Sequence, residues 1–158
     1  MLERLTRRGL PEQAPDAETI ARWFSATGVT QADATRTADA VRRMLSAETL
    51  MHVFDPACFD AAHNEIELFA PDGALLRIDR LIERGNDILV VDYKLRLLPV
   101  ERAAYADQLR GYVAAISPMY PGRNVRAGVA TAQGEWIDRD ALPKPVQTSH
   151  DDSQGALF

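Results

Sequence analysis

The fold is decided by residues 75–94, LLRIDRLIERGNDILVVDYK, in which two strand-like runs flank the dipeptide Gly85-Asn86. A two-residue loop with glycine in its first position is typical of a hairpin closed by a type II′ turn. The loop length fixes the register of such a hairpin, and counting outward from the turn places Asp79 opposite Asp92. The sequence therefore predicts a β-hairpin that brings two carboxylates face to face.

The surrounding elements follow from the hydrophobic period and from the turn residues. The run 88–91 is apolar on both faces, which predicts a central strand covered on both sides. Thr30 is a predicted helix N-cap, with Asp33 three residues later. In chain order we expect helices over 17–24 and from Thr30 to about Leu50, strands over 65–69, 75–83 and 88–93, a crossover helix over 101–117, and strands over 125–131 and 135–137. This order predicts an α/β fold: N-terminal helices, a three-stranded meander, a crossover helix and further strands.

The composition bounds the class of protein. The chain has 158 residues, 46% of them hydrophobic and 26% charged, which suits one globular domain with a core. We expect a single domain over 1–142, mainly helical over 1–62 and α/β over 63–142, followed by a flexible tail over 143–158. No run is long and apolar enough for a membrane span, and we expect no secretory signal, because no apolar stretch follows residues 1–8. The one cysteine, Cys58, excludes an intramolecular disulfide and, with three histidines, a Cys/His zinc site. A cytoplasmic location and no membrane partner are expected.

The two facing carboxylates indicate a site. Asp79 and Asp92 are expected to form a non-hydrogen-bonded pair with Cα atoms roughly 4.5 Å apart, where like charges repel each other. Lys94 lies on the same strand face as Asp92. Carboxylate oxygens suit Mg²⁺ or Mn²⁺, which could activate a water molecule while Lys94 positions it or stabilises phosphate charge. An ordinary cross-strand ion pair, with Lys94 reaching solvent, is the alternative.

The predicted crossover helix adds polar groups to this patch. Tyr105, Gln108 and Tyr112 recur at spacings of three and four, which places them on one helix face. They could contact a phosphate or stack on a base, or the tyrosines could simply form the edge of the core. The net charge of −5 argues against nucleic acid, but residues 77–126 hold nine basic and six acidic side chains, a local balance of +3. The overall charge therefore does not exclude DNA.

Three motifs in this order resemble one family. Ile78-Asp79-Arg80-Leu81, Asp92-Tyr93-Lys94 and Tyr105-x-x-Gln108-Leu109-x-x-Tyr112 resemble the RecB/AddA-type nuclease domain. This PD-(D/E)xK module stands at the C-terminus of UvrD-like helicase-nucleases, which process DNA double-strand ends. The likeness runs from about Leu2 to Leu142. It implies a restriction-endonuclease-like core, exonuclease-type hydrolysis of DNA in double-strand break repair and recombination, and a helicase subunit or domain as a partner.

The resemblance also implies roles for single residues. Asp79 and Asp92 would bind Mg²⁺ or Mn²⁺ together with the backbone carbonyl of Tyr93, and Lys94 would be the catalytic lysine. The remaining expectations are Gln108 and Tyr112 as motif residues that close the site, Glu65 as a supporting carboxylate, and Arg77, Arg80, Arg96 and Tyr105 as DNA contacts.

Two departures from the family pattern keep other interpretations open. Leu95 stands where the family usually has threonine. The family also carries a metal-binding histidine on its first helix, and residues 1–5 are expected to lie past that position, while His52 and His63 do not occupy it. A catalytically weak or inactive module that binds DNA or docks to a helicase is therefore the second interpretation. A plain α/β domain with a cross-strand ion pair is the third.

Overall fold

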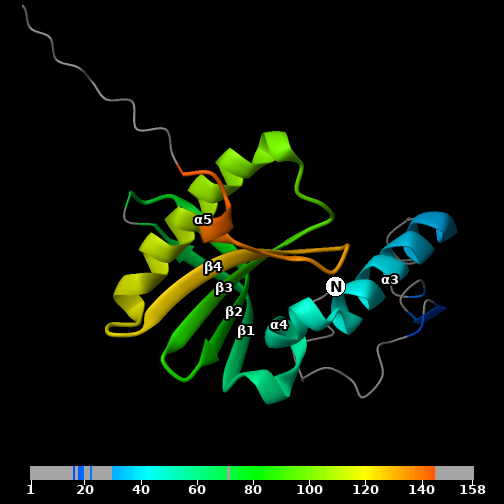
Figure 1. Cartoon of the computed structure of the whole chain (residues 1–158), viewed down its shortest axis with the longest axis horizontal. Helices are drawn as coiled ribbons and strands as arrows, with labels where there is room; N and C mark the ends of the chain where they lie inside the picture. The colour runs from blue at the N-terminus through cyan, green and yellow to red at the C-terminus, as the bar shows by residue number, and fades with distance from the viewer. Residues whose placement is uncertain (1–15, 17, 20–21, 23–29, 71, 145–158) are drawn as a thin grey trace, which may run out of the picture.

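The structure is a computed structural model of the chain. It describes residues 16, 18–19, 22, 30–70 and 72–144. Most of the predicted helix over 17–24 and nearly all of the predicted tail over 143–158 lie outside these residues. The described part is a mixed α/β fold built around a twisted five-stranded sheet (Figure 1). The predicted fold class is confirmed.

The sheet has the strand order β1-β2-β3-β4-β5. Its first three strands form the predicted antiparallel meander, and β4 pairs with β3 in parallel after the crossover helix α5. The short β5 pairs with β4 in antiparallel fashion. The bounds are β1 Ala61–Phe69, β2 Leu75–Arg84, β3 Asp87–Lys94, α5 Arg102–Ile116, β4 Asn124–Thr131 and β5 Trp136–Asp138.

The hairpin of β2 and β3 has the predicted register over most of its length. Arg84 pairs with Asp87, and the ladder continues to the pair of Arg80 and Val91. Gly85 has a φ of +51°, and Asn86 is not among the described residues with a positive φ, as a type II′ turn requires. The ladder ends one step before Asp79 and Asp92, so these residues do not form the predicted strand pair.

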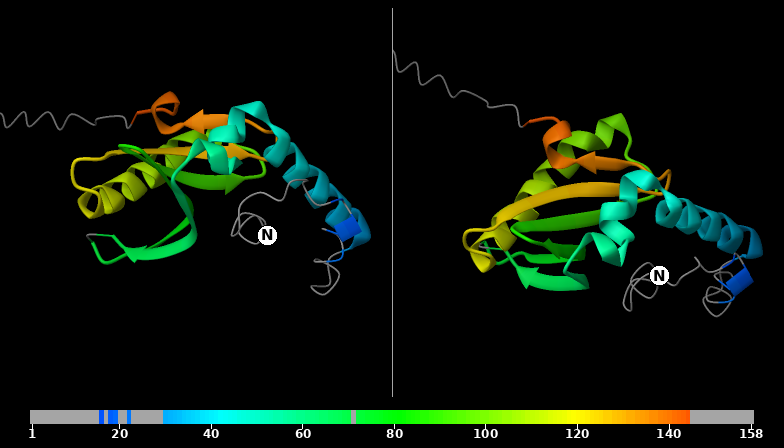
Figure 2. Two further views of the ribbon diagram at one scale, coloured as in Figure 1. Left: turned by 90° about the horizontal axis from the view of Figure 1, so that it is seen from below. Right: turned by 60° about the horizontal axis from the view of Figure 1, so that its bottom comes forward.

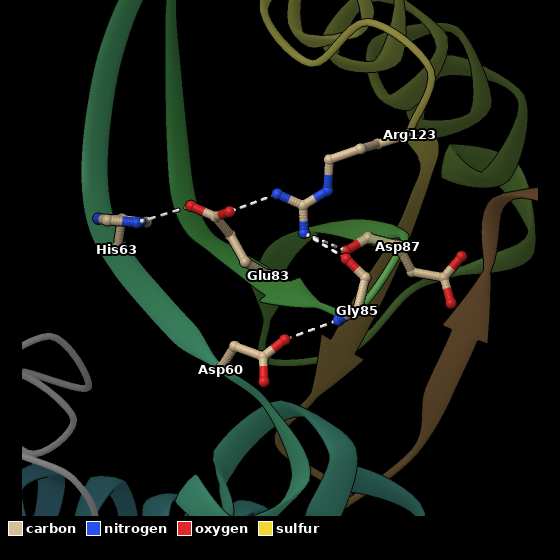
Figure 3. A network of polar contacts seen from close by, with 6 residues as sticks. All are labelled: Asp60, His63, Glu83, Gly85, Asp87 and Arg123. Carbon is tan, nitrogen blue, oxygen red and sulfur yellow. Dashed lines mark hydrogen bonds and ion pairs between the residues drawn. The ribbon is translucent and has the colours of Figure 1, made fainter.

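Polar contacts hold the turn of this hairpin in place (Figure 3). Arg123, just before β4, donates to Glu83 Oε2 at 2.5 Å and to the carbonyl of Gly85 at 2.9 Å. Asp60, just before β1, accepts a hydrogen bond from the backbone N–H of Gly85 at 2.7 Å. The turn is therefore tied to the segments just before β1 and just before β4.

The helical part differs from the sequence prediction at one point. The helix α3, Gln31–Ser46, begins at the predicted cap, where Thr30 accepts from the N–H of Asp33. It ends at Ala47, whose extended backbone breaks the helix before the predicted end at Leu50. A 3₁₀ turn, Glu48–Leu50, and the short α4, Met51–Phe54, follow. After the break, the buried side chain of Leu50 packs in the same cluster as Ile82 and Val91 of the sheet. Within the described residues, no helix has the length and apolar character needed to cross a membrane.

The core has two parts, one on each face of the sheet. Val90 packs with Leu109 of α5, whereas its neighbour Val91 packs with Val53 and Phe54 of α4. Successive residues of a strand point to opposite faces, so α5 covers one face and α4 the other, as Figures 1 and 2 show. The predicted central strand with two covered faces is confirmed.

Candidate active site

The candidate site lies where β2 separates from β3. In a regular continuation of the hairpin, the backbone N–H of Tyr93 would donate to the carbonyl of Ile78. It donates instead to Asp79 Oδ2 at 2.9 Å. The carboxylate of Asp79 thus replaces a strand carbonyl, and the hydrogen bond holds it beside the carboxyl end of β3.

Asp92 is a buried carboxylate beside this point. Its residue exposure is 4%, and its Oδ2 lies 2.9 Å from Lys94 Nζ. That oxygen is buried and has no hydrogen-bond partner of regular geometry in the described residues. Burial raises the pKa of the Asp92 carboxyl above its ordinary value, Lys94 opposes this, and the charge of Asp79 adds to it. A buried carboxylate so poorly solvated is electrostatically suited to a cation.

Lys94 is the cation that faces Asp92. Its side chain is 27% exposed, and its ammonium lies 4.8 Å from the ring centroid of Tyr105. Burial acts to lower the pKa of Lys94, but the Asp92 carboxylate and Tyr105 outweigh it, so the pKa is raised. Lys94 therefore stays protonated at neutral pH and acts in the site as a donor and a positive charge.

Tyr112 and Gln108 join α5 to β2. The buried hydroxyl of Tyr112 donates to the carbonyl of Arg77 at 3.0 Å and accepts from Gln108 Nε2 at 2.6 Å. Burial raises the pKa of Tyr112, as do the charges of Asp92 and Asp79, so the hydroxyl remains a donor. This contact holds β2 two residues before Asp79.

Arg80 requires a correction. It was expected to contact DNA, but its exposure is 1%. Its guanidinium donates to the carbonyl of Val53 at 3.0 Å and to Asn64 Oδ1 at 2.8 Å. Arg80 shares a strand face with Val91, which is the face covered by α4, so its side chain does not reach the surface.

Glu65 and the exposed arginines lie around the site without joining it. Glu65 forms an ion pair with Arg77 at 2.8 Å, with side chains that are 43% and 57% exposed. Arg96 is exposed in the loop after β3. In the described residues, no group of three or more His, Cys, Asp or Glu side chains is placed to hold a metal ion, so Glu65 does not join Asp79 and Asp92.

The two described histidines have other partners. His52 contacts Trp136 edge-on, with ring centroids 5.0 Å apart, and burial lowers the pKa of His52. His63 Nε2 lies 3.2 Å from Glu83 Oε1 (Figure 3). Neither completes the carboxylate site, and residues 1–5 lie outside the described part.

The residues present fit a hard divalent cation. Two carboxylates from neighbouring strands converge, and one of them has a buried oxygen with no regular hydrogen bond. Oxygen donors of this kind suit Mg²⁺ or Mn²⁺, which keep part of their water shell. Sequence reasoning found these residues, but it missed the separation of the strands at Asp79. It also missed the left-handed backbone of Glu65, for which glycine or asparagine would have been the usual sequence marker.

The sequence matches the family model described as the PD-(D/E)XK nuclease superfamily over residues 1–154. No curated protein matches it significantly. The family match spans both strands that carry the carboxylates, Lys94 and the crossover helix.

Proposed function

Because the chain belongs to the PD-(D/E)XK nuclease superfamily, we propose that it is a metal-dependent deoxyribonuclease that hydrolyses phosphodiester bonds. Membership of the superfamily supports a nuclease that binds DNA. The observation that carries the finer proposal is the convergence of Asp79, Asp92 and Lys94 at the point where β2 leaves β3.

The finer family type is also part of the proposal. The ordered motifs around Asp79, Lys94 and Tyr112 support a RecB/AddA-type nuclease domain, which would occupy residues 1–142. Such a domain would act from DNA ends, as an exonuclease, beside a helicase subunit or domain. Its role would then lie in double-strand break repair and recombination.

The proposed cofactor is Mg²⁺ or Mn²⁺. Asp79, Asp92 and the backbone carbonyl of Tyr93 would hold it. A divalent cation bound there supplies a Lewis acid for the phosphate and lowers the pKa of a bound water.

The protein's own groups divide the remaining work. The N–H of Tyr93 fixes the Asp79 carboxylate. Lys94, kept protonated by Asp92, would donate to the attacking water or to the phosphate oxygens as negative charge develops. Gln108 is exposed on α5 and Tyr105 half-buried beside it, where they could meet the DNA strand. The exposed Arg96, together with Arg77, would neutralise neighbouring phosphates.

The test is cleavage of linear DNA with Mg²⁺ or Mn²⁺ and with EDTA. We expect cleavage that requires the metal and that disappears in Asp92→Asn and in Lys94→Ala. Asp39→Asn, which removes an exposed carboxylate of α3, is the charge-matched control and should cleave like the wild type. Cleavage that survives both site substitutions, or that persists in EDTA, would refute the proposal.

The second candidate is a module that binds DNA or docks to a helicase with little or no catalysis. It is favoured because few metal ligands converge in the described residues. His52 and His63 contact other residues, and only two carboxylates of the described part of the chain lie at the proposed metal site. Calorimetry with Mn²⁺ separates the two candidates. Undetectable metal binding together with intact DNA binding would support this second function.

A further inference from the structure

β1 contains a residue in a backbone conformation that strands do not normally use. Glu65 has a φ of +51°, and it is the one non-glycine residue with a positive φ in the described part of the chain. Most side chains avoid this left-handed region because Cβ approaches the following carbonyl oxygen. The strand nevertheless continues in register on both sides, through Asn64 and Ile66. Strain of this kind persists where the surrounding structure imposes it, often at functional sites.

The strained residue lies opposite the proposed metal ligand. The ladder of β1 and β2 pairs Asn64 with Arg80 and Ile66 with Ile78. The step between these pairs consists of Glu65 and Asp79, and it is missing from the ladder. Glu65 of β1 and Asp79 of β2 therefore lie opposite each other in the two strands.

The side chains of β2 depart from simple alternation between the two sheet faces at this step. By simple alternation Ile78 and Arg80 would point to the same side of the sheet. Arg80 points to the α4 face, where it bonds the carbonyl of Val53, whereas Ile78 packs in the cluster that contains Leu109 of α5. The apolar residues of the hairpin tip follow Ile78 and pack against the same cluster: Ile66, Leu68 and Leu76. The hairpin of β1 and β2 thus bends toward α5 at Glu65 and Asp79, and Figure 2 shows the curve of both strands.

The same step is where β2 leaves β3. The last ladder pair is Arg80 with Val91, and the N–H of Tyr93 that a straight β2 would have bonded is taken by Asp79 Oδ2. Beyond the bend, the hydroxyl of Tyr112 holds the carbonyl of Arg77. The bent arm is therefore anchored on α5, while the carboxylate at the bend reaches back to β3.

We propose that the left-handed backbone of Glu65 is a positioning device for Asp79. The bend at Glu65 detaches β2 from β3 and turns the Asp79 carboxylate toward the N–H of Tyr93, the residue between Asp92 and Lys94. Its consequence for metal binding rests on the proposed function, whereas its consequence for the Asp79–Tyr93 hydrogen bond does not.

The side chain of Glu65 contributes little to this role. Its ion pair with Arg77 joins two side chains that are 43% and 57% exposed, and such pairs are weak in water. Residues that accept a left-handed backbone should therefore replace Glu65 without loss, whether or not they carry a carboxylate. Residues that resist this backbone should not.

Four substitutions at one position separate the two roles. Glu65→Gly and Glu65→Asn keep the left-handed backbone and remove the carboxylate. Glu65→Gln removes only the charge. Glu65→Val opposes the backbone, because β-branched residues are strongly disfavoured at positive φ. Glu67→Gly and Glu67→Val are matched controls, since Glu67 is an exposed residue of the same strand with ordinary strand geometry.

The first readout uses metal-free protein. We expect Glu65→Gly to raise Tm by about 2–4 °C through relief of strain, and Glu67→Gly to lower Tm, because glycine weakens an ordinary strand position. Hydrogen exchange at the amide of Tyr93 reports the bond to Asp79. That amide should stay protected in the glycine, asparagine and glutamine variants of Glu65 and in Glu67→Val, and lose protection in Glu65→Val.

The second readout is calorimetry with Mn²⁺ alone. Wild type and the glycine, asparagine and glutamine variants should bind with equal affinity, and Glu65→Val should bind about 10–100-fold more weakly, as expected for a residue that orients a ligand. Weak binding by Glu65→Gly and Glu65→Gln with a protected Tyr93 amide would make the carboxylate a ligand and overturn the inference. A protected amide in Glu65→Val would also overturn it. Absence of Mn²⁺ binding in the wild type would refute the proposed function, and the exchange data would still decide the inference.

Discussion

Removal of the Lys94 ammonium leaves a buried carboxylate without its counter-charge. The Asp92 side chain is 5% exposed, and its Oδ2 lies 2.9 Å from Lys94 Nζ. At an effective dielectric constant near 20, two unit charges at that separation attract each other by roughly 6 kcal/mol. Lys94 is 27% exposed, so solvent screens part of this energy. We expect Lys94→Met, which conserves much of the side-chain volume, to lower the free energy of unfolding by about 2–3 kcal/mol at pH 8 without metal.

This loss of stability should depend on pH with a definite sign. Burial raises the pKa of Asp92, and removal of Lys94 takes away the main group that opposes the rise. A carboxyl group whose pKa is raised by folding binds its proton in the folded state before it does so in the unfolded chain. The folded state therefore gains stability as the pH falls through the raised pKa. The deficit of Lys94→Met should be largest above that pKa and should shrink toward pH 5.

Urea unfolding in EDTA at pH 5, 6, 7 and 8 measures both effects. Asp92→Asn and the double variant with Lys94→Met complete a double-mutant cycle, in which the double variant should recover most of the lost stability. Lys144→Met is the matched control, because Lys144 is exposed and lies far along the chain from the site. A deficit below about 0.5 kcal/mol at pH 8, or one that is equal at pH 5 and pH 8, would refute the reasoning.

Three further predictions concern the sheet and its attachment to α5. Gly128→Ala would place a Cβ against the ring of Trp136, so urea unfolding should show a loss of about 1–3 kcal/mol, and unchanged stability would contradict this packing. Tyr112→Phe removes the hydroxyl that holds β2, so single-turnover DNA cleavage should slow by about tenfold while calorimetric Mn²⁺ affinity is nearly kept; an unchanged rate would count against a positioning role. Arg123→Met should cost about 1–2 kcal/mol at pH 7, because Arg123 bonds Glu83 and lowers its pKa. That stabilisation is present above the unfolded pKa and lost as the pH falls through the folded one, so a deficit that persists undiminished in acid unfolding would argue against the pair.

Much of the regular fold could be predicted because short-range rules determine it. Gly85 in a two-residue loop determines the turn type and hence the register, which the structure follows as far as Arg80 and Val91. The run around Val90 is apolar on both faces, which predicted a strand covered on both sides. In the structure, α5 covers one of these faces and α4 the other. These rules depend on a few neighbouring residues, and no distant contact overrides them here.

The departures arise where tertiary contacts interrupt the local pattern. Arg80 belongs to a residue type that is usually exposed, and its burial depends on carbonyl and amide acceptors at Val53 and Asn64. The helix break at Ala47 depends on docking of the next turn against the sheet. The bend at Asp79 depends on a backbone angle of Glu65, which a glutamate does not indicate in the sequence.

The bend explains how two carboxylates can be kept close in a stable hairpin. In a regular ladder, Asp79 and Asp92 would face each other at the closest cross-strand distance, where like charges repel each other. Where β2 separates from β3, the N–H of Tyr93 donates to Asp79 instead of to a strand carbonyl, and Asp92 pairs with Lys94. What remains is a buried carboxylate with a raised pKa, a local instability that a bound cation would relieve. A cation present at one hundred times its dissociation constant would then add about 2.7 kcal/mol to the stability of the folded state. A stabilisation by Mn²⁺ that depends on Asp79 and Asp92 is what a binding site would show, whereas a structural ion pair of Asp92 with Lys94 would show none.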